Sequence, residues 1–406
     1  MAPRLDSRSP IEEEKTPYYD TSRFYPICLG QVLHGRYQIA TKLGYGSSST
    51  VWLARDLHSW RWSRERYVAL KINAVNRRSG QNTAENELAM LKHISSVNKN
   101  HQGWNFVRRL SGSFTIDGAI GTHLCLVLEF LREPLWLYCR RFVGGVIPVD
   151  VLKVIMQMIL HGLDYLHSEC QVIHTDLKLD NILVKLEDLA ILDRDALDEY
   201  HNPLPQKITH DRTIYLSRNN YGPFSIPAGI VQIADFGYSK SGKTHHSGCI
   251  QAEAYRAPEV IIDSGYSCSA DIWSLGVMMW DLLEGKRLFD PIDKRISDEY
   301  DDSVHLAQLT GLLGPPPPDM LRSGQRTSMF YEPNGNFKHP ELIPQDLKFE
   351  NTVSMISGQE KTKFLEFVKK MVRWNPEERS TASNLLKDPW LYQDFAAEHP
   401  FEKNQR

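Results

Sequence analysis

The stretch HTDLKLDN, from His174 to Asn181, contains three polar side chains in the order that phosphoryl transfer requires. An aspartate can accept or orient the hydroxyl proton, a lysine two residues later can neutralise the transferring phosphate, and an asparagine can hold Mg²⁺. Asp176, Lys178 and Asn181 fill these positions. On its own the stretch could also be a polar turn before the strand-like NILV. The rest of the chain must decide between the two.

A glycine-rich stretch, GYGSSSTV from Gly44 to Val51, lies upstream. Its glycines would let the backbone approach phosphates and donate N–H groups to them. A simple hairpin turn has the same composition, so the stretch is weak support by itself. A dinucleotide-binding loop is disfavoured, because the strand-like VWLARD follows the glycines where a helix would be needed. Ser49 takes the third glycine position and is small enough to be tolerated there.

A lysine and two acidic residues complete a possible nucleotide site. Lys71 ends VALK on an apolar strand, where it could simply extend to solvent. The following segment TAENELAMLKHI predicts a helix with Thr83 as N-cap, and its Glu87 shares a face with apolar residues, so Glu87 is preferred over Glu85 as the partner of Lys71. DFG, after the strand-like VQIA, supplies Asp235 as a second metal ligand.

Two downstream motifs have structural interpretations. Glu259 of YRAPE and Arg379 of NPEERST could be solvated charges, or a buried pair that braces the larger lobe. Asp271 of DIWS could anchor the backbone of the catalytic loop from a helix N-terminus. Six motifs in this order leave little room for coincidence.

Composition excludes several classes of protein. The chain has 406 residues, 41% hydrophobic and 24% charged, and a net charge of −3, with a pI near 6.6. These values give no argument for nucleic-acid or membrane binding. Six cysteines without paired spacing suggest reduced thiols and an intracellular protein. No apolar run approaches the ~18 residues of a membrane span, so we expect a soluble protein in the cytoplasm, the nucleus or both.

The periodicity of the chain changes near Pro134. Before it, alternating strand-like runs lie at 37–43, 50–55, 67–75 and 123–131; after it, helical patterns dominate, as in VDVLKVIMQMILHGLDYLHSE. Residues 1–36 are polar and are expected to form a partly mobile extension. Residues 185–230 form an insertion too long for a hairpin loop. Its acidic first half could be a helix, and a solvated surface loop is favoured over a regulatory or docking element.

In this order the motifs resemble those of eukaryotic protein kinases across about residues 37–396. YRAPE and the stretch around LLGPPPP resemble the group of cyclin-dependent, MAP and SR-protein kinases. HGRYQIATKLGYGSSSTVWLARD, GTHLCLVLEFL, HTDLKLDNIL and the insertion are most similar to the SR-protein kinases. The resemblance implies an α+β bilobal fold: an extension at 1–36, a small β-rich lobe at 37–131, a larger mainly α lobe at 132–396 and a tail at 397–406.

The resemblance also implies phosphorylation of serine or threonine in proteins, with ATP and Mg²⁺ as cofactors. ATP would lie between the lobes against a hinge at Glu129 to Leu131, with Leu128 as gatekeeper. Asp176, Lys178, Lys71 and Glu87 would be catalytic, and Asn181 and Asp235 would bind the metal. The residues implied to contact the nucleotide are Leu43, Gly44, Tyr45, Gly46, Ser47, Ser48, Ser49, Val51, Ala69, Lys71, Glu129, Leu131 and Leu183.

Thr175 stands where many kinases carry an arginine that pairs with a phosphorylated activation-loop residue. Without that cation, we expect activity that does not require activation-loop phosphorylation, and a turn-capping role for Thr175 is compatible with this. The hydroxyl groups available in the loop are those of Ser239, Ser241, Thr244 and Ser247. Loss of catalysis after their replacement by alanine would contradict the expectation.

Ala252 lies seven residues before Glu259, where such kinases usually place a Ser or Thr that bridges the catalytic Asp and Lys. Losing that hydrogen bond costs about 0.5–1.5 kcal/mol, so we expect weakened and not absent activity. DFGYSK also differs from the family's usual sequence, and the insertion is short for that family. Regulation is therefore expected to differ.

The implied partners are protein substrates, with Arg/Ser-rich chains as candidates, and no direct nucleic acid or membrane. The acidic run SDEYDD could dock such chains through Asp298, Glu299, Asp301 and Asp302, or be a solvated face. A pseudokinase scaffold that binds nucleotide or partners without turnover is the competing interpretation, and a dehydrogenase is a distant third. The sequence does not define the oligomeric state.

Overall fold

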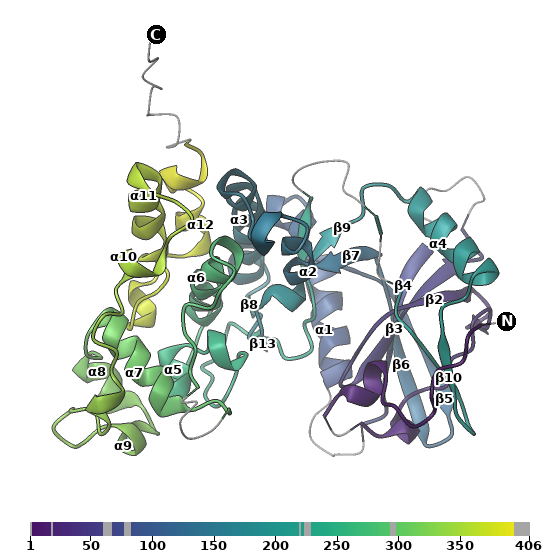
Figure 1. Ribbon diagram of the computed structural model, residues 1–406, viewed down its shortest axis with the longest axis horizontal. Coiled ribbons are helices and arrows are strands. Elements are labelled where there is room, and N and C mark those ends of the chain that lie inside the picture. Colours follow the sequence, from purple (N-terminus) through teal and green to yellow (C-terminus); the bar gives the residue numbers. More distant parts are fainter. Residues whose placement is uncertain are drawn as a thin grey trace, which may run out of the picture.

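A β-rich lobe and a mainly helical lobe make up the fold in the computed structural model (Figure 1). The structure describes residues 2–17, 19–59, 67–76, 83–218, 221–222, 229–292 and 298–393. The predicted tail at 397–406 and Ser297 lie outside the described residues. Among the described residues, no helix combines the length and apolar character that a membrane crossing requires.

The smaller lobe is built on one antiparallel sheet with strand order β1-β2-β3-β4-β6-β5. β2 and β3 form the predicted hairpin around Ser47 and Ser48, and their register pairs Gly44 with Val51. β5 was not expected, because its sequence LSGSFTIDG has two glycines and no fully buried face. The strands are β1 (Val32–Leu33), β2 (Tyr37–Gly46), β3 (Ser49–Asp56), β4 (Tyr67–Asn73), β5 (Leu110–Gly118) and β6 (Gly121–Leu128).

Helix α1 (Thr83–Ser96) is the main helix of this lobe, and it begins at the predicted residue. Its buried side chains are Glu87, Leu91 and Ile94, spaced four and three residues apart on one face. Leu91 and Ile94 belong to the main hydrophobic core, and most of the other residues of this core lie in the larger lobe. The predicted inward direction of Glu87 is confirmed.

The larger lobe is organised around α6 (Ser269–Leu283), whose side chains are almost all buried. A helix that is apolar on all sides can only lie inside a core. Gly276 permits close packing there, because a Cβ atom at this position would lie 2.8 Å from the Cβ of Met371. The other helices are α2 (Leu135–Cys139), α3 (Val149–Asp164), α5 (Pro258–Ile261), α7 (Asp302–Leu313), α8 (Pro318–Ser323), α9 (Thr327–Phe330), α10 (Phe349–Thr352), α11 (Gly358–Val368) and α12 (Ala382–Leu385).

Two small sheets place the catalytic segments beside each other. β12 (Val231–Ile233), β9 (Ile182–Lys185) and β7 (Leu131–Pro134) form one, and β13 (Lys240–Ser241) pairs with β8 (Val172–Ile173) in the other. The strand predicted at 123–131 is therefore two strands. β6 ends at Leu128, and β7 pairs with β9 in the sheet of the larger lobe, so residues 129 and 130 connect the lobes.

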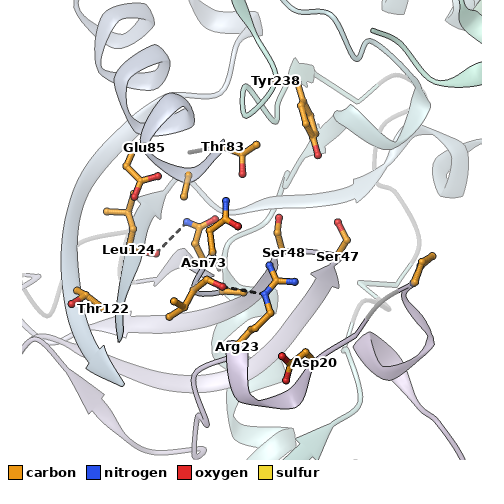
Figure 2. Close-up of a pocket in the computed structure, with 15 residues that line it drawn as sticks. Asp20, Arg23, Ser47, Ser48, Asn73, Thr83, Glu85, Thr122, Leu124 and Tyr238 are labelled. Carbon is orange, nitrogen blue, oxygen red and sulfur yellow. Dashed lines mark hydrogen bonds between the residues drawn. The ribbon is translucent and has the colours of Figure 1, made fainter. Parts of the chain in front are cut away.

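The N-terminal extension is packed against the small lobe, in contrast to the mobile segment expected from its polar sequence. The backbone of Arg23 accepts from Val75 N–H at 2.8 Å, and its guanidinium donates to the Val75 carbonyl at 3.0 Å. Arg23 lines a cavity of about 600 Å³ together with Ser47 and Ser48 of the glycine-rich turn, and Figure 2 shows these three side chains. The extension thus holds the backbone just after the end of β4, the strand that carries Lys71.

The insertion is also packed, which corrects the expectation of a solvated surface loop. Its acidic half forms the predicted helix, α4 (Ala190–His201), and its second half forms a hairpin of β10 (Gln206–Ile208) and β11 (Thr213–Tyr215). Figure 1 shows α4 and β10 beside the β-rich lobe. Leu192 and Tyr221 are buried in a cluster with Leu53 of β3 and Phe130 of the lobe connection. The insertion therefore covers the connection between the lobes.

Candidate active site

A single carboxylate anchors the backbone of the catalytic loop. Asp271, in the first turn of α6, accepts the backbone N–H groups of His174 at 2.7 Å and Thr175 at 2.9 Å. It also lies 2.9 Å from the imidazole Nε2 of His167. The predicted anchoring role of Asp271 is confirmed, and the loop that follows β8 is thereby fixed to α6, a helix whose residues are almost all buried.

The three polar residues of the catalytic loop contact one another directly. The amine of Lys178 lies 2.9 Å from a carboxylate oxygen of Asp176. The amide of Asn181 donates to the same carboxylate at 3.0 Å and to the Asp176 carbonyl at 2.8 Å. Burial alone would lower the pKa of the Lys178 amine, but the hydrogen bond to Asp176 outweighs burial and raises this pKa above its usual value. A neutralising cation therefore stands next to the candidate base.

A chain of charges connects the small lobe with the metal-binding aspartate. Lys71 Nζ lies 2.7 Å from Glu87 and 3.3 Å from Asp235. Burial alone would lower the pKa of Lys71, but the charges of Asp235 and Glu87 outweigh burial and raise it. The charge of Lys71 in turn lowers the pKa of Asp235. Both groups are therefore ionised at neutral pH, as nucleotide and metal binding require.

The register of the sheet places the glycine-rich turn next to the strand that carries Lys71. Val51, directly after the turn, pairs with Lys71 on β4 and with Gly44 on β2. Ser47 and Ser48 are exposed at the tip, Ser49 is buried, and the Ser48 carbonyl accepts from Ala74 N–H at 2.9 Å. The turn that joins β2 and β3 is thus next to β4, the strand that carries the lysine.

The remaining predicted nucleotide contacts come from both lobes. Ala69 on β4 pairs with Leu128 on β6, and Leu43 packs against the same core. Leu183 lies on β9 of the larger lobe, where it pairs with Gln232. Tyr45 is exposed on β2 with Gly46 beside it. These placements are compatible with a cleft between the lobes.

At the lobe connection, Glu129 is already engaged with three cations. Its carbonyl accepts from Arg108 at 3.2 Å, and its carboxylate lies 2.7 Å from Lys185 and 3.4 Å from Arg109. Leu131 is buried at the start of β7. The roles of Glu129 and Leu131 in binding the nucleotide stay predictions.

Two oxygen-donor side chains, Asn181 and Asp235, could hold a metal. The backbone N–H of Ala234, next to Asp235, donates to the Asn181 carbonyl at 2.8 Å, so the two segments are joined. In the described part of the chain, no three His, Cys, Asp or Glu residues gather into a metal site. This donor set fits Mg²⁺, which prefers oxygen ligands and completes its shell with phosphates and water.

Gln251, which the sequence did not single out, helps to hold the activation segment. Thr175 and Gln251 both adopt left-handed backbone conformations, with φ of 69° and 68°, and each costs about 1–3 kcal/mol. Hydrogen bonds surround them: Gln251 N–H donates to the Thr175 carbonyl at 2.9 Å, and its side-chain amide donates to Ser274 Oγ at 2.9 Å. Hydrogen bonds between residues this far apart in the chain have no pattern in a sequence, so Gln251 was missed.

The positions of Ala252 and Ser239 bear on the expectations of weakened activity and altered regulation. Ala252 lines the cavity that contains Asp176 and Lys178 and brings no hydroxyl group to it. Ser239 is fully buried, and its hydroxyl donates to the His174 carbonyl at 3.2 Å. A phosphate on Ser239 would have to break this contact, whereas Thr244 and Ser247 are exposed.

The predicted brace of the larger lobe is present. Arg379 donates two hydrogen bonds to the Glu259 carboxylate, at 2.6 and 2.7 Å, and both side chains are fully buried. Paired in this way, the two charges satisfy each other, while removal of either one would strand a buried charge. The interpretation as solvated charges is excluded.

Two carboxylates of the acidic run near Tyr300 have partners within the larger lobe. Asp301 caps α7 by accepting from the Ser303 N–H at 2.6 Å, and Asp302 lies 2.7 Å from Arg326. Asp298 and Glu299 are exposed. Asp301 is exposed as well, so it differs from Asp298 by its role as the helix cap.

Comparison with known proteins identifies the family of the chain. The protein kinase domain family matches residues 37–391. A serine/threonine protein kinase of Aspergillus fumigatus is 39% identical over 96% of this chain and 93% of its own length. The serine/threonine-protein kinase SRPK of Physarum polycephalum is 30% identical over 94% of this chain and 91% of its own.

More distant relatives are also named as kinases. SRSF protein kinase 3 of Mus musculus is 25% identical over 94% of this chain and 90% of its own length. A crystal structure of a kinase domain superposes with a TM-score of 0.69 at 22% identity, and covers 92% of this chain and 100% of that domain. That likeness concerns the fold alone.

Proposed function

Because the chain belongs to the protein kinase family, we propose that its interlobe cleft transfers the γ-phosphate of ATP to serine or threonine hydroxyls of protein substrates. The observation that carries the proposal is the assembled chain Glu87–Lys71–Asp235, with contacts of 2.7 and 3.3 Å. Protein kinases need the ion pair between this lysine and this glutamate, and an aspartate placed to hold Mg²⁺. The pair is formed here, and Asp235 lies next to it.

Each polar residue then has one task. Lys71 binds the non-transferred phosphates, held in place by Glu87. Asp176 accepts or orients the hydroxyl proton of the substrate, and Lys178, 2.9 Å away, neutralises charge on the transferring phosphate. Asn181 and Asp235 would hold Mg²⁺, which supplies neutralisation of the phosphate oxygens when bound. Ala252 provides no hydroxyl bridge, so we expect moderate turnover.

The absence of an arginine at position 175 bears on regulation. We infer that activity does not depend on a phosphorylated activation loop, because Thr175 carries no charge to receive the phosphate. Burial of Ser239 supports this inference, since its hydroxyl is already used to hold the loop. Ser241, Thr244 and Ser247 remain the sites that a test must remove.

Arg/Ser-rich proteins are the substrate class that we propose. The support is the similarity to SRPK-type kinases and to a relative named as an SRSF protein kinase. Asp298 and Glu299 offer exposed negative charge on the larger lobe, which would attract cationic chains. Asp301 and Asp302 are left out of the test, because they cap α7 and pair with Arg326, and their replacement would also disturb the larger lobe.

A randomised peptide library with ATP and Mg²⁺ tests the proposal. We expect phosphate on serine or threonine, with arginine enriched at flanking positions. The double change Asp298→Asn and Glu299→Gln should raise the KM of the best arginine peptide several-fold. The matched change Glu377→Gln and Glu378→Gln removes the same charge from another exposed site and should not. Acceptance of acidic peptides with equal efficiency would contradict the substrate class.

A further inference from the structure

Three consecutive backbone carbonyl groups after Asp235 accept hydrogen bonds from side chains of other segments. The Asn86 amide of α1 donates to the Gly237 carbonyl at 2.8 Å and to the Ser239 carbonyl at 3.2 Å. Between them, the Tyr238 carbonyl accepts from the Thr175 hydroxyl at 2.9 Å. The carbonyls therefore alternate between the small lobe and the catalytic loop.

The chemistry of these groups defines the orientation of the donors. A carbonyl oxygen can only accept, so the NH₂ group of Asn86 must face both Gly237 and Ser239, and the Thr175 hydroxyl must donate its proton to Tyr238. Asn86 directly precedes Glu87 on α1. One turn of helix therefore presents a carboxylate to Lys71 and an amide to the activation segment.

The segment held in this way begins at the metal-binding aspartate. Asp235 has a left-handed backbone with φ of 65°, and it lies two residues before the first of the three carbonyls. A strained residue persists only where its surroundings fix it. Asn86 and Thr175 supply this fixation on opposite sides of Tyr238, whose own side chain is 60% exposed.

On the premise of the proposed kinase activity, we propose that Asn86 and Thr175 are positioning residues that hold the Gly237–Ser239 backbone. Through it they keep Asp235 and α1 in the arrangement needed for transfer. In many kinases a phosphate on the activation loop orders this region through an arginine. Here two neutral side chains do so, and they are present in the unmodified chain.

Replacement of Asn86 by leucine in the full chain tests the proposal, because leucine is similar in size and lacks both donors. We expect kcat to fall by about tenfold, the effect of losing hydrogen bonds worth about 1.4 kcal/mol. Thr175→Val keeps the branched shape and removes the hydroxyl, and should lower kcat by about three- to tenfold. The KM of the peptide substrate should change less than twofold in both variants.

Gln157→Leu provides the matched control. Gln157 of α3 also donates its amide to a distant carbonyl, that of Leu391 at 2.8 Å, and it is partly buried like Asn86. It should lower the melting temperature similarly and leave kcat within twofold of wild type. If Asn86→Leu and Gln157→Leu lower stability equally and both retain kcat, the proposed positioning role is wrong.

A second readout does not depend on turnover. Amide hydrogen exchange in the unliganded protein should become faster at residues 236–241 in the Asn86→Leu and Thr175→Val variants, and stay unchanged there in Gln157→Leu. This result would support the role of Asn86 and Thr175 even if the wild type failed to phosphorylate any substrate. Unchanged exchange at residues 236–241 in both variants would overturn it, whatever the activity.

Discussion

Asp281 of α6 is a residue whose charge the fold disfavours. It accepts a hydrogen bond from the Tyr255 hydroxyl at 3.2 Å, and burial raises its pKa to about 6 from a usual 3.8. Because the folded state holds the proton more tightly than the unfolded state, the free energy of unfolding falls as pH rises from about 4 to 6. Above pH 6 the full penalty, about 2–3 kcal/mol, is present.

Asp281→Asn should remove this penalty while keeping an acceptor for Tyr255. We expect the variant to be more stable than the wild type at pH 7.5, by up to about 2–3 kcal/mol, and to lose most of this advantage at pH 4. Urea denaturation at the two pH values measures the difference. An advantage that is the same at both pH values would show that ionisation of Asp281 is not its cause.

Residues with charged side chains were predictable from their order along the chain, including Asp271, which binds backbone N–H groups, whereas amide side chains that donate to backbone carbonyls were not. Lys71, Asp176 and Asp235 have chemistry that few other roles require, and their order along the chain selects it. Asn86 and Gln251 donate to the backbone carbonyls of Gly237 and Ala270, and asparagine and glutamine are also common on any solvated surface. Only the folded arrangement distinguishes them.

Among the elements, β2 is held on its outer side by two segments that the sequence suggested were loose. The buried amine of Lys42 contacts Glu13 and lies 3.5 Å from Glu12 of the extension, and it donates to the Tyr215 carbonyl of the insertion at 3.1 Å. The Lys42 carbonyl accepts from Arg218 N–H at 2.8 Å. Extension, insertion and sheet therefore share one ion cluster.

Lys42→Met should destabilise the protein by about 3–5 kcal/mol, because it leaves the partly desolvated Glu13 without its cation. Lys363→Met is the control, since the pair Lys363–Glu366 is exposed and contributes less than about 1 kcal/mol. Thermal or chemical denaturation gives the comparison. A loss for Lys42→Met no larger than for Lys363→Met would mean that the cluster does not hold the extension and insertion.

The helix within the insertion was predictable and its place was not. Periodicity and acidic residues indicate α4, but its contacts with β2 depend on residues more than a hundred positions away, such as the bond of 3.3 Å between Thr41 and Glu199. Polar composition was taken as a sign of solvation. In this segment the polar groups pair with one another, as in the contacts of Arg218 with Asp198 and Glu199.

For the whole molecule, the insertion and the extension change how the two lobes are connected. Leu53 of the small lobe, Phe130 of the connection and Tyr221 of the insertion form one buried cluster, with the rings of Phe130 and Tyr221 5.5 Å apart. The bilobal fold was implied by the resemblance of the ordered motifs to those of protein kinases. The cluster across the connection could not follow from it, because no motif records which surfaces an insertion covers.

The most direct measurement is the rate of phosphate transfer from ATP, with Mg²⁺ and an arginine/serine peptide, by wild type and by Asp176→Asn. Asparagine keeps the shape of the side chain and cannot accept the hydroxyl proton. We predict turnover by the wild type and a loss of at least about a hundredfold in the variant, as expected for removal of a general base. Equal rates in the two proteins, or no transfer by either, would contradict the catalytic assignment.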